Sequence, residues 1–160
     1  MNIFVVDTDP QVAARMLCNR HVVKMVTETA QLLTTCYPPG YMRFKYTHVN
    51  HPCAVWTRQS LTNFKWLLVH GLELAEEYTR RYHRVHASAD VIETCLDDVP
   101  DIPELGLTPF ARAIKEPWKT QTSHLHIVDA YRAYYIGDKA RFARWTPWAR
   151  SPAWWPEREA

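Results

Sequence analysis

Three residues of one predicted helix carry side chains suited to covalent catalysis. His21, Lys24 and Glu28 follow one another at spacings of three and four, so a helix presents them on one face. The imidazole offers a base, the amine a nucleophile and the carboxylate a group that stabilises charge. A crowded or desolvated lysine loses its proton and can form a Schiff base. The alternative is a surface Lys24–Glu28 ion pair worth about 0.3–0.5 kcal/mol.

A second group of polar residues lies just before a predicted helix that begins at Pro52. His48, Asn50 and His51 precede its unpaired amides, and a helix N-terminus binds anions such as phosphate. The same side chains can instead cap the helix. Metal binding by these histidines has no recognisable ligand spacing, even if His21 and Cys18 or Cys53 are added. We therefore expect no metal and no organic cofactor.

A third group interleaves aromatic and basic residues near the C-terminus. Tyr131, Arg132, Tyr135 and Lys139 combine rings that stack on unpaired bases with cations that hold phosphates. The alternative is a helix end packed against the core. From Phe110 to Arg150 there are eight basic residues and three acidic ones. This balance is compatible with phosphate contact or with an ordinary solvated surface.

Composition and periodicity predict a mostly α fold, a compact single-domain helical bundle spanning 1–160, with irregular loops rich in proline and aromatic residues. The chain has only four glycines but eleven prolines, which suits helices joined by proline-punctuated loops. Residues 2–6 are apolar and predict a strand or an extended segment. The tail, 145–160, carries four tryptophans and three prolines and is expected to pack as extended chain.

Hydrophobic spacing and punctuation place the individual helices. A first helical pattern starts at Asp7–Pro10, capped by Asp or Thr, and runs to about Thr35 with a break near Asn19. A long helix is predicted from Pro52 to Tyr82, with buried positions that include Val55, Leu61 and Phe64. Two shorter helices are predicted at about 88–96 and from 123 or 124 to 135, the second ending near Gly137 as a left-handed residue.

Net charge, cysteine spacing and hydropathy indicate the cellular compartment of the protein. The net charge is +2 and the four cysteines form no CxxC pair. We find no signal peptide and no apolar run of membrane-spanning length. These features predict reduced thiols, no membrane partner and a cytoplasmic protein.

Four segments, taken in order, resemble the pyrimidine-dimer DNA glycosylases of the phage endonuclease V type, as a distant member. His21 is followed seven residues later by Glu28, and a helical region with a basic end runs from Arg58 to Arg81. An acidic loop reads Asp98-Val-Pro-Asp101-Ile102-Pro103, and Tyr131-Arg132-x-Tyr134-Tyr135 is followed by Gly137 and Lys139. Together the segments span about residues 2 to 142.

The resemblance implies a monomeric helical enzyme of DNA repair that kinks duplex DNA and flips a nucleotide out, at a cost of a few kcal/mol. It also implies a nucleoid-associated protein of a bacterial or phage-infected cell. In that family an N-terminal α-amine attacks the sugar C1′, releases the base and forms a Schiff base, and a glutamate assists. Glu28 and His21 occupy the matching positions. Arg58 and the histidine and tyrosine groups above become candidates for contact with DNA.

The sequence departs from the family at the nucleophile. The family exposes a small residue by removing the initiator methionine, whereas Asn2 follows Met1 here and is a poor substrate for that removal. Two arginines that the family has near its glutamate are replaced in this sequence by Thr27 and Gln31. We therefore expect that either the amine of Met1 or Lys24 takes over, or that the chemistry has changed. The spacing of Lys24 and Glu28 favours Lys24 as the nucleophile, and Asn2 stays among the candidate catalytic residues.

Three functions follow from these patterns. The first is a DNA glycosylase and abasic-site lyase acting on a damaged or modified pyrimidine. The second keeps the fold but transfers or hydrolyses a group on a nucleotide, with His21 and Glu28 as acid and base. The third is a non-catalytic DNA-binding module in which the helix face is only an ion-paired surface.

Overall fold

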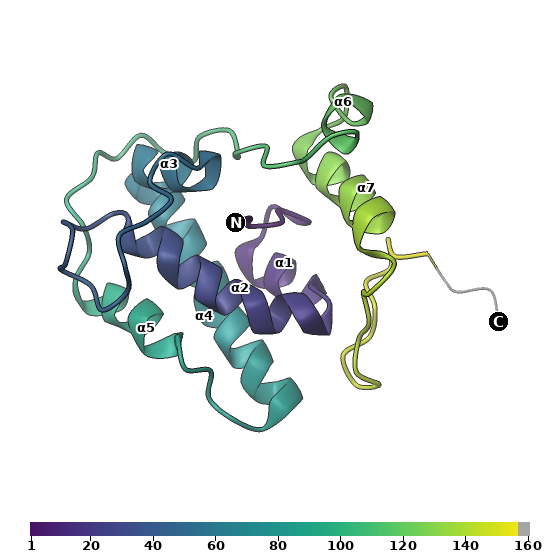
Figure 1. Cartoon of the computed structure of the whole chain (residues 1–160), viewed down its shortest axis with the longest axis horizontal. Helices are drawn as coiled ribbons and strands as arrows, with labels where there is room; N and C mark the ends of the chain where they lie inside the picture. Colours follow the sequence, from purple (N-terminus) through teal and green to yellow (C-terminus); the bar gives the residue numbers. More distant parts are fainter. Residues whose placement is uncertain (157–160) are drawn as a thin grey trace.

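A computed structural model describes residues 1–156, which form a compact, mostly helical single domain (Figure 1). The described part holds seven helices and no strand, in agreement with the predicted fold class. They are α1 (Pro10–Met16), α2 (Asn19–Thr34), α3 (Pro52–Gln59), α4 (Leu61–Tyr82), α5 (Ala89–Asp97), α6 (Trp118–Gln121) and α7 (Ile127–Lys139).

Helix α4 is the centre of the fold and packs against α1, α2, α3 and α5. The single helix predicted from Pro52 to Tyr82 is wrong, because the chain is extended at Ser60 with φ −151°. Ser60 Oγ accepts hydrogen bonds from the amides of Thr62, at 3.3 Å, and Leu105, at 3.1 Å. The break therefore caps α4 and docks the following loop. Helix α3 buries other residues, so Val55 is 49% exposed rather than buried.

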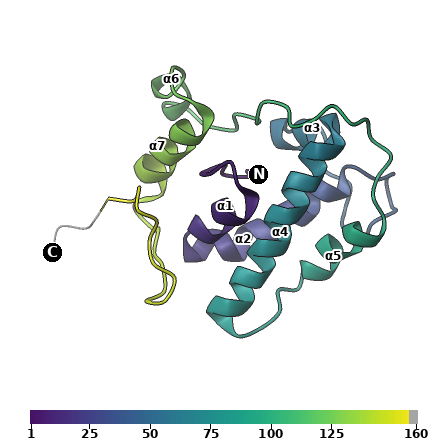
Figure 2. The same ribbon diagram turned by 180° about the vertical axis from the view of Figure 1, so that it is seen from behind.

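The N-terminal segment lies between the α1–α5 body and α7, as both ribbon views show (Figure 1, Figure 2). It forms no strand, yet its residues from Ile3 to Val6 are all buried. Asn2 Oδ1 accepts from the amides of Ile3, at 2.8 Å, and Phe4, at 3.0 Å. Phe4 has a φ of +58°, an uncommon conformation for a residue with a Cβ atom. Of the two predictions for residues 2–6, a strand or an extended segment, the extended segment is therefore closer to the observed structure.

The first two helices follow the prediction closely. Asp9 Oδ1 accepts from the amides of Gln11 and Val12, both at 2.9 Å, and so caps α1 with Pro10 in its first turn. The predicted break near Asn19 is present between Met16 and Asn19. Capping side chains and proline act locally, which is why the sequence showed them.

Helix α7 differs from its prediction at both ends. It begins at Ile127 and continues to Lys139, so Gly137 lies within the helix instead of ending it. A Cβ added to Gly137 would stand 1.9 Å from the ring of Trp118. The glycine is therefore needed for close packing of α6, which the sequence did not predict, against α7. Its place is set by a tertiary contact and not by a left-handed turn.

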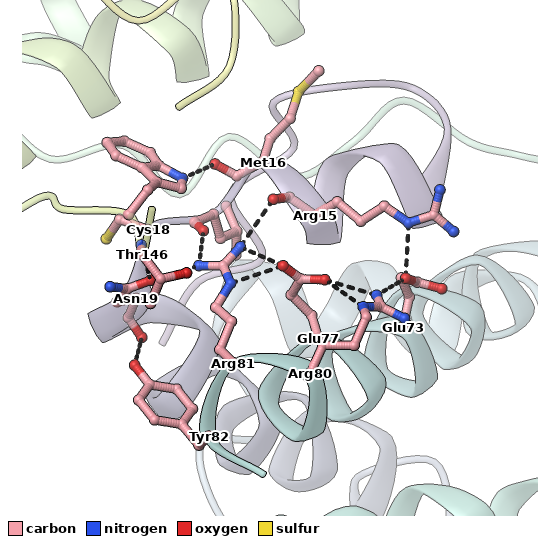
Figure 3. A network of polar contacts seen from close by, with 12 residues as sticks. Arg15, Met16, Cys18, Asn19, Glu73, Glu77, Arg80, Arg81, Tyr82 and Thr146 are labelled. Carbon is pink, nitrogen blue, oxygen red and sulfur yellow. Dashed lines mark hydrogen bonds and ion pairs between the residues drawn. The ribbon is translucent and has the colours of Figure 1, made fainter. Parts of the chain in front are cut away.

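A network of ion pairs joins α4 to α1 and to the start of α2 (Figure 3). Arg81 is only 4% exposed and donates to Glu77 at 2.7 Å, and also to Leu17 O and Asn19 Oδ1. Arg80 pairs with Glu77 and Glu73, and Glu73 also pairs with Arg15. Because Asn19 is the first residue of α2, the network fixes where that helix begins, within one turn of His21.

The segment after α7 returns to the same helix start. Asn19 donates its backbone N–H to Arg144 O at 2.8 Å, and its Oδ1 accepts from the Thr146 amide at 3.3 Å. Trp145 Nε1 donates to Met16 O at 3.2 Å. The prediction that the tail packs as extended chain is wrong in part, because hydrogen-bonded turns close at Thr146–Ala149 and Pro152–Trp155. Residues 157–160 lie outside the described residues. No helix in this described part is long and apolar enough to cross a membrane.

Candidate active site

A small recess of about 180 Å³ lies where the N-terminal segment, α2 and α7 meet. Ligand pockets that enclose a whole small molecule usually have about 300–1,000 Å³, so this recess accepts the edge of a larger ligand. Its lining residues come from both ends of the chain: Met1, Asn2, Phe4, His21, Lys24, Met25, Glu28, Tyr134 and Lys139.

Glu28 lies at the base of the recess and is 7% exposed. Its Oε2 accepts from the backbone N–H of Asn2 at 3.0 Å, and its Oε1 is 3.1 Å from Lys24 Nζ. The Lys24 side chain is 62% exposed. The three residues predicted from spacing therefore line one recess. The ion-pair alternative is also present, but it joins an accessible amine to a buried carboxylate.

The environment of His21 keeps its imidazole neutral at ordinary pH. Burial lowers the pKa of His21 to about 3, and the charges of Lys139, Lys24 and Arg20 act in the same direction. Its Nδ1 lies 2.6 Å from the Tyr135 hydroxyl, which itself accepts from the Cys18 amide at 3.0 Å. A buried hydroxyl needs an acceptor, and we assign His21 Nδ1 that role. The proton of the imidazole is then on Nε2.

Phe4 and α7 complete the walls of the recess. The Phe4 ring stacks on His21, with ring centroids 4.5 Å apart. Lys139 Nζ lies 4.9 Å from the Tyr134 ring centroid and 2.7 Å from Asp138. Burial works against ionisation of Asp138, but hydrogen bonds from Lys115 and Lys139 outweigh it and lower its pKa. Phe4 and Tyr134 were not among the predicted site residues, because no local pattern distinguishes them from core aromatics.

Cationic side chains surround the opening. Lys24, Lys139 and Arg20 all lie close enough to lower the pKa of His21, and Asp138 opposes them. Arg20 and Arg141 lie over the Phe142 ring at 4.7 and 5.2 Å, and that ring meets the edge of His21. Such a rim attracts phosphates.

The residues predicted before α3 lie near the recess without lining it. His51 Nδ1 accepts from the Cys53 amide at 3.1 Å and caps α3, so the capping alternative holds for this residue. Burial lowers the pKa of His51, and the charges of the Met1 amine and His48 add to the effect. His48 and Asn50 are exposed, and Arg58 donates to Val49 O at 2.6 Å. Their contact with DNA stays a prediction.

The tyrosines predicted to stack on bases are instead part of the core. Tyr131 and Tyr135 are fully buried, and Tyr131 donates to Ala111 O at 2.7 Å. Arg132 donates to Val6 O at 2.9 Å and lies over the Trp154 ring. The alternative of a helix end packed against the core is correct for these residues, because α7 turns this face inward. Lys139 alone of the predicted group lines the recess.

The residues weighed as metal ligands are not gathered together. Within residues 1–156 no group of three or more His, Cys, Asp or Glu side chains could hold a metal ion. His21 lies against Phe4 and Tyr135, whereas Cys18 and Cys53 are buried as free thiols.

A family model described as pyrimidine dimer DNA glycosylase matches residues 1–90. The chain belongs to the pyrimidine dimer DNA glycosylase family. The match includes Asn2, His21, Lys24 and Glu28, whereas the α7 wall of the recess lies beyond it. Membership supports a pyrimidine dimer glycosylase kind of function in DNA repair, with DNA as the substrate. The comparisons with curated proteins and with solved structures each gave no match.

Proposed function

We propose that the protein is a DNA glycosylase and abasic-site lyase whose chemistry takes place in the recess around Glu28. The observation that carries the proposal is the contact of one buried carboxylate with an accessible amine, at the position where the family has its glutamate. Glu28 lies 3.1 Å from Lys24 Nζ, and cations rim the opening.

Lys24 is the proposed nucleophile. The Asn2 nitrogen also lies 3.0 Å from Glu28, but it is a peptide nitrogen in a chain that carries Met1, and its lone pair is delocalised. Lys24 Nζ is a primary amine on the same carboxylate. As a free base it attacks the sugar C1′, the bond from C1′ to the base breaks with its electron pair going to the base, and the departing base takes a proton from water. Opening of the sugar ring then gives a protonated imine between Nζ and C1′.

Glu28 has two proposed roles in these steps. Its carboxylate accepts one proton from the attacking amine and passes it to O4′ as the sugar ring opens, and its restored negative charge then stabilises the cationic imine. The same carboxylate removes a proton from C2′, after which the C3′–O bond breaks and the strand is cleaved. Water releases the amine. Neutral His21 donates a hydrogen bond from Nε2 to the sugar or to a phosphate oxygen.

Borohydride trapping tests the proposal directly. The protein is incubated with duplex oligonucleotides that carry an abasic site or a pyrimidine dimer, and borohydride reduces any imine to a stable amine adduct. Peptide mapping by mass spectrometry then locates the modified residue. We expect adduct on Lys24 and strand cleavage. A protein that binds these duplexes but gives neither adduct nor cleavage is a binding module, and the enzymatic proposal is then wrong.

Matched variants separate Lys24 from the N-terminal amine. Lys24→Ala is expected to lose the adduct, whereas Lys65→Ala removes an exposed lysine of α4 and is expected to retain it. Adduct at full yield in Lys24→Ala, mapped to Met1 or to Asn2 after removal of Met1, assigns the reaction to the N-terminus. That result refutes the role of Lys24 and leaves the glycosylase function intact.

A further inference from the structure

A second cavity, outside the segment matched by the family, lies in the chain that follows α7. This tail cleft has a volume of about 470 Å³, which is within the range of ligand-binding pockets. Its lining includes Arg144, Trp145, Thr146, Arg150 and Trp155. The cleft therefore combines aromatic rings, cations and hydroxyl groups, and no carboxylate stands among its described lining residues.

The two tryptophans form one aromatic wall. The ring centroids of Trp145 and Trp155 are 4.9 Å apart, and the hydrogen bond from Trp145 Nε1 to Met16 O fixes the first indole. Thr146 Oγ1 is buried and has no hydrogen-bond partner within residues 1–156. A buried polar atom without a partner is costly.

The tail cleft is connected to the recess through side chains that touch one another. The Tyr135 ring lies 5.1 Å from His21 on one side and 6.1 Å from Trp155 on the other. Exposed arginines stand at both places. Arg20 and Arg141 lie over the Phe142 ring, which meets the edge of His21, and Arg144 and Arg150 line the cleft. A DNA backbone that takes the path from the recess to the cleft would meet these cations.

We propose that the tail cleft binds an unpaired nucleotide of the strand held at the recess, with its base against Trp145 and Trp155 and its phosphates on Arg144 and Arg150. Aromatic stacking on unpaired bases beside basic groups is how proteins hold single strands. The proposal rests on the proposed function for the presence of DNA at the recess. It adds a preference for substrates that are unpaired beside the reacting nucleotide.

The test compares two duplexes that carry the same abasic site, one fully paired and one with three unpaired nucleotides beside it. Binding is measured by fluorescence anisotropy with the Arg144→Ala/Arg150→Ala variant. A control, Lys45→Ala/Lys65→Ala, removes two exposed lysines outside the path. We expect the arginine variant to bind the unpaired substrate roughly tenfold more weakly and the paired one nearly unchanged. The salt slope should fall by about 0.7 for each single-strand phosphate that the variant no longer neutralises.

A base analogue reports on stacking in the cleft independently of affinity. With 2-aminopurine among the unpaired nucleotides, the wild-type protein is expected to change its emission, and the change should be smaller with Trp155→Phe and with the arginine variant. Equal affinities and equal emission in all proteins overturn the cleft proposal. Trapping at Lys24 can still succeed in that case, so the proposed function is judged separately. If trapping at Lys24 is lost while the effects of the cleft variants remain, the proposed function is wrong and the cleft proposal stands.

Competition with a free nucleotide shows whether the cleft binds a nucleotide of the DNA strand or a free nucleotide. If deoxynucleoside monophosphate competes for the cleft as strongly as the unpaired duplex binds, the site serves a free nucleotide and not the substrate strand. That result also overturns the proposal.

Discussion

The Tyr135 hydroxyl stands between the start of α2 and the His21 imidazole. It accepts from the Cys18 amide and lies 2.6 Å from His21 Nδ1. One buried oxygen therefore links the N-cap of α2 to the ring that lines the recess. Because Tyr135 is fully buried, we propose that it acts on the site by holding the tautomer of His21 and not by contact with DNA.

Replacing Tyr135 with phenylalanine is expected to release this tautomer. The buried Cys18 amide and His21 Nδ1 both lose their partner, so the free energy of unfolding should fall by about 1–3 kcal/mol. The rate of strand cleavage should fall roughly tenfold more than in a core control such as Phe64→Leu, which is similarly destabilised. Urea unfolding and single-turnover cleavage measure the two effects. Equal rates for the two variants at matched stability would show that the tautomer has no role.

The pKa of His21, lowered to about 3, predicts a specific pH dependence of stability. The unfolded chain takes up a proton near pH 6.5 and the folded chain does not, so unfolding binds protons and stability falls as the pH drops from about 6.5 toward 3. The slope for one such group is at most about 1.4 kcal/mol per pH unit. His21→Gln should reduce that slope, measured by urea unfolding between pH 4 and 8. His70, with its pKa lowered to about 4 by burial, contributes to the remaining slope, as do His51 and His86, whose pKa values burial also lowers.

Glu28→Gln is expected to abolish catalysis while the fold persists. The amide can still accept from the Asn2 backbone N–H, but it cannot accept a proton from Lys24 or stabilise an imine. The loss of general acid–base catalysis predicts a rate at least about 100-fold lower. Abasic-site cleavage measures it, and Glu76→Gln on exposed α4 surface is the control. Cleavage within a few-fold of wild type would exclude Glu28 from the chemistry.

Gly137→Ala tests whether packing outweighs helix propensity in α7. Alanine is favoured over glycine within a helix by about 1 kcal/mol. A Cβ here would stand 1.9 Å from Trp118, and overpacking usually costs about 1–3 kcal/mol. We expect a net loss of stability in urea unfolding. Trp118→Ala combined with Gly137→Ala should recover stability relative to Trp118→Ala alone, and a double variant less stable than Trp118→Ala would contradict the packing explanation.

Arg81→Leu is expected to be among the most damaging single substitutions. Glu77 would keep the half-exposed Arg80 but lose its buried partner Arg81, so the cost should lie at or below the about 3–5 kcal/mol of breaking an isolated buried pair. The carbonyl of Leu17 and the Asn19 side chain, both hydrogen-bonded to Arg81, would also lose a donor. Thermal unfolding measures the loss. Arg84→Leu, which removes an exposed arginine just past α4, should change little.

Local sequence signals predicted the helices better than the connections between them. The Asp9 cap, Pro10 and the break before Asn19 depend on neighbouring residues, and the structure has them as predicted. The break at Ser60 depends on hydrogen bonds with the loop at 103–105. The helical role of Gly137 depends on Trp118. Neither long-range interaction leaves a mark in the hydrophobic period of the chain.

In the candidate site, too, the local arrangement was predicted and the long-range contacts were not. Spacing on one helix face brought His21, Lys24 and Glu28 together, because residues three and four apart are always neighbours in a helix. The walls formed by Phe4 and Tyr134 come from distant segments. The tyrosines of α7 were mistaken for surface residues in one of two interpretations, since aromatic and basic residues alternate both on DNA-binding faces and at buried helix ends.

The hydrogen bonds that Asn19 makes with the segment after α7 bear on how the protein matures during its synthesis. Chains fold from the N-terminus as they leave the ribosome, so α1 to α5 can pack first. The start of α2 then still lacks Arg144 O and the Thr146 amide, and the recess lacks Lys139. A nascent chain therefore carries Lys24, the proposed nucleophile, in an unfinished recess. The structure around that recess is completed only once residues up to Thr146 have emerged.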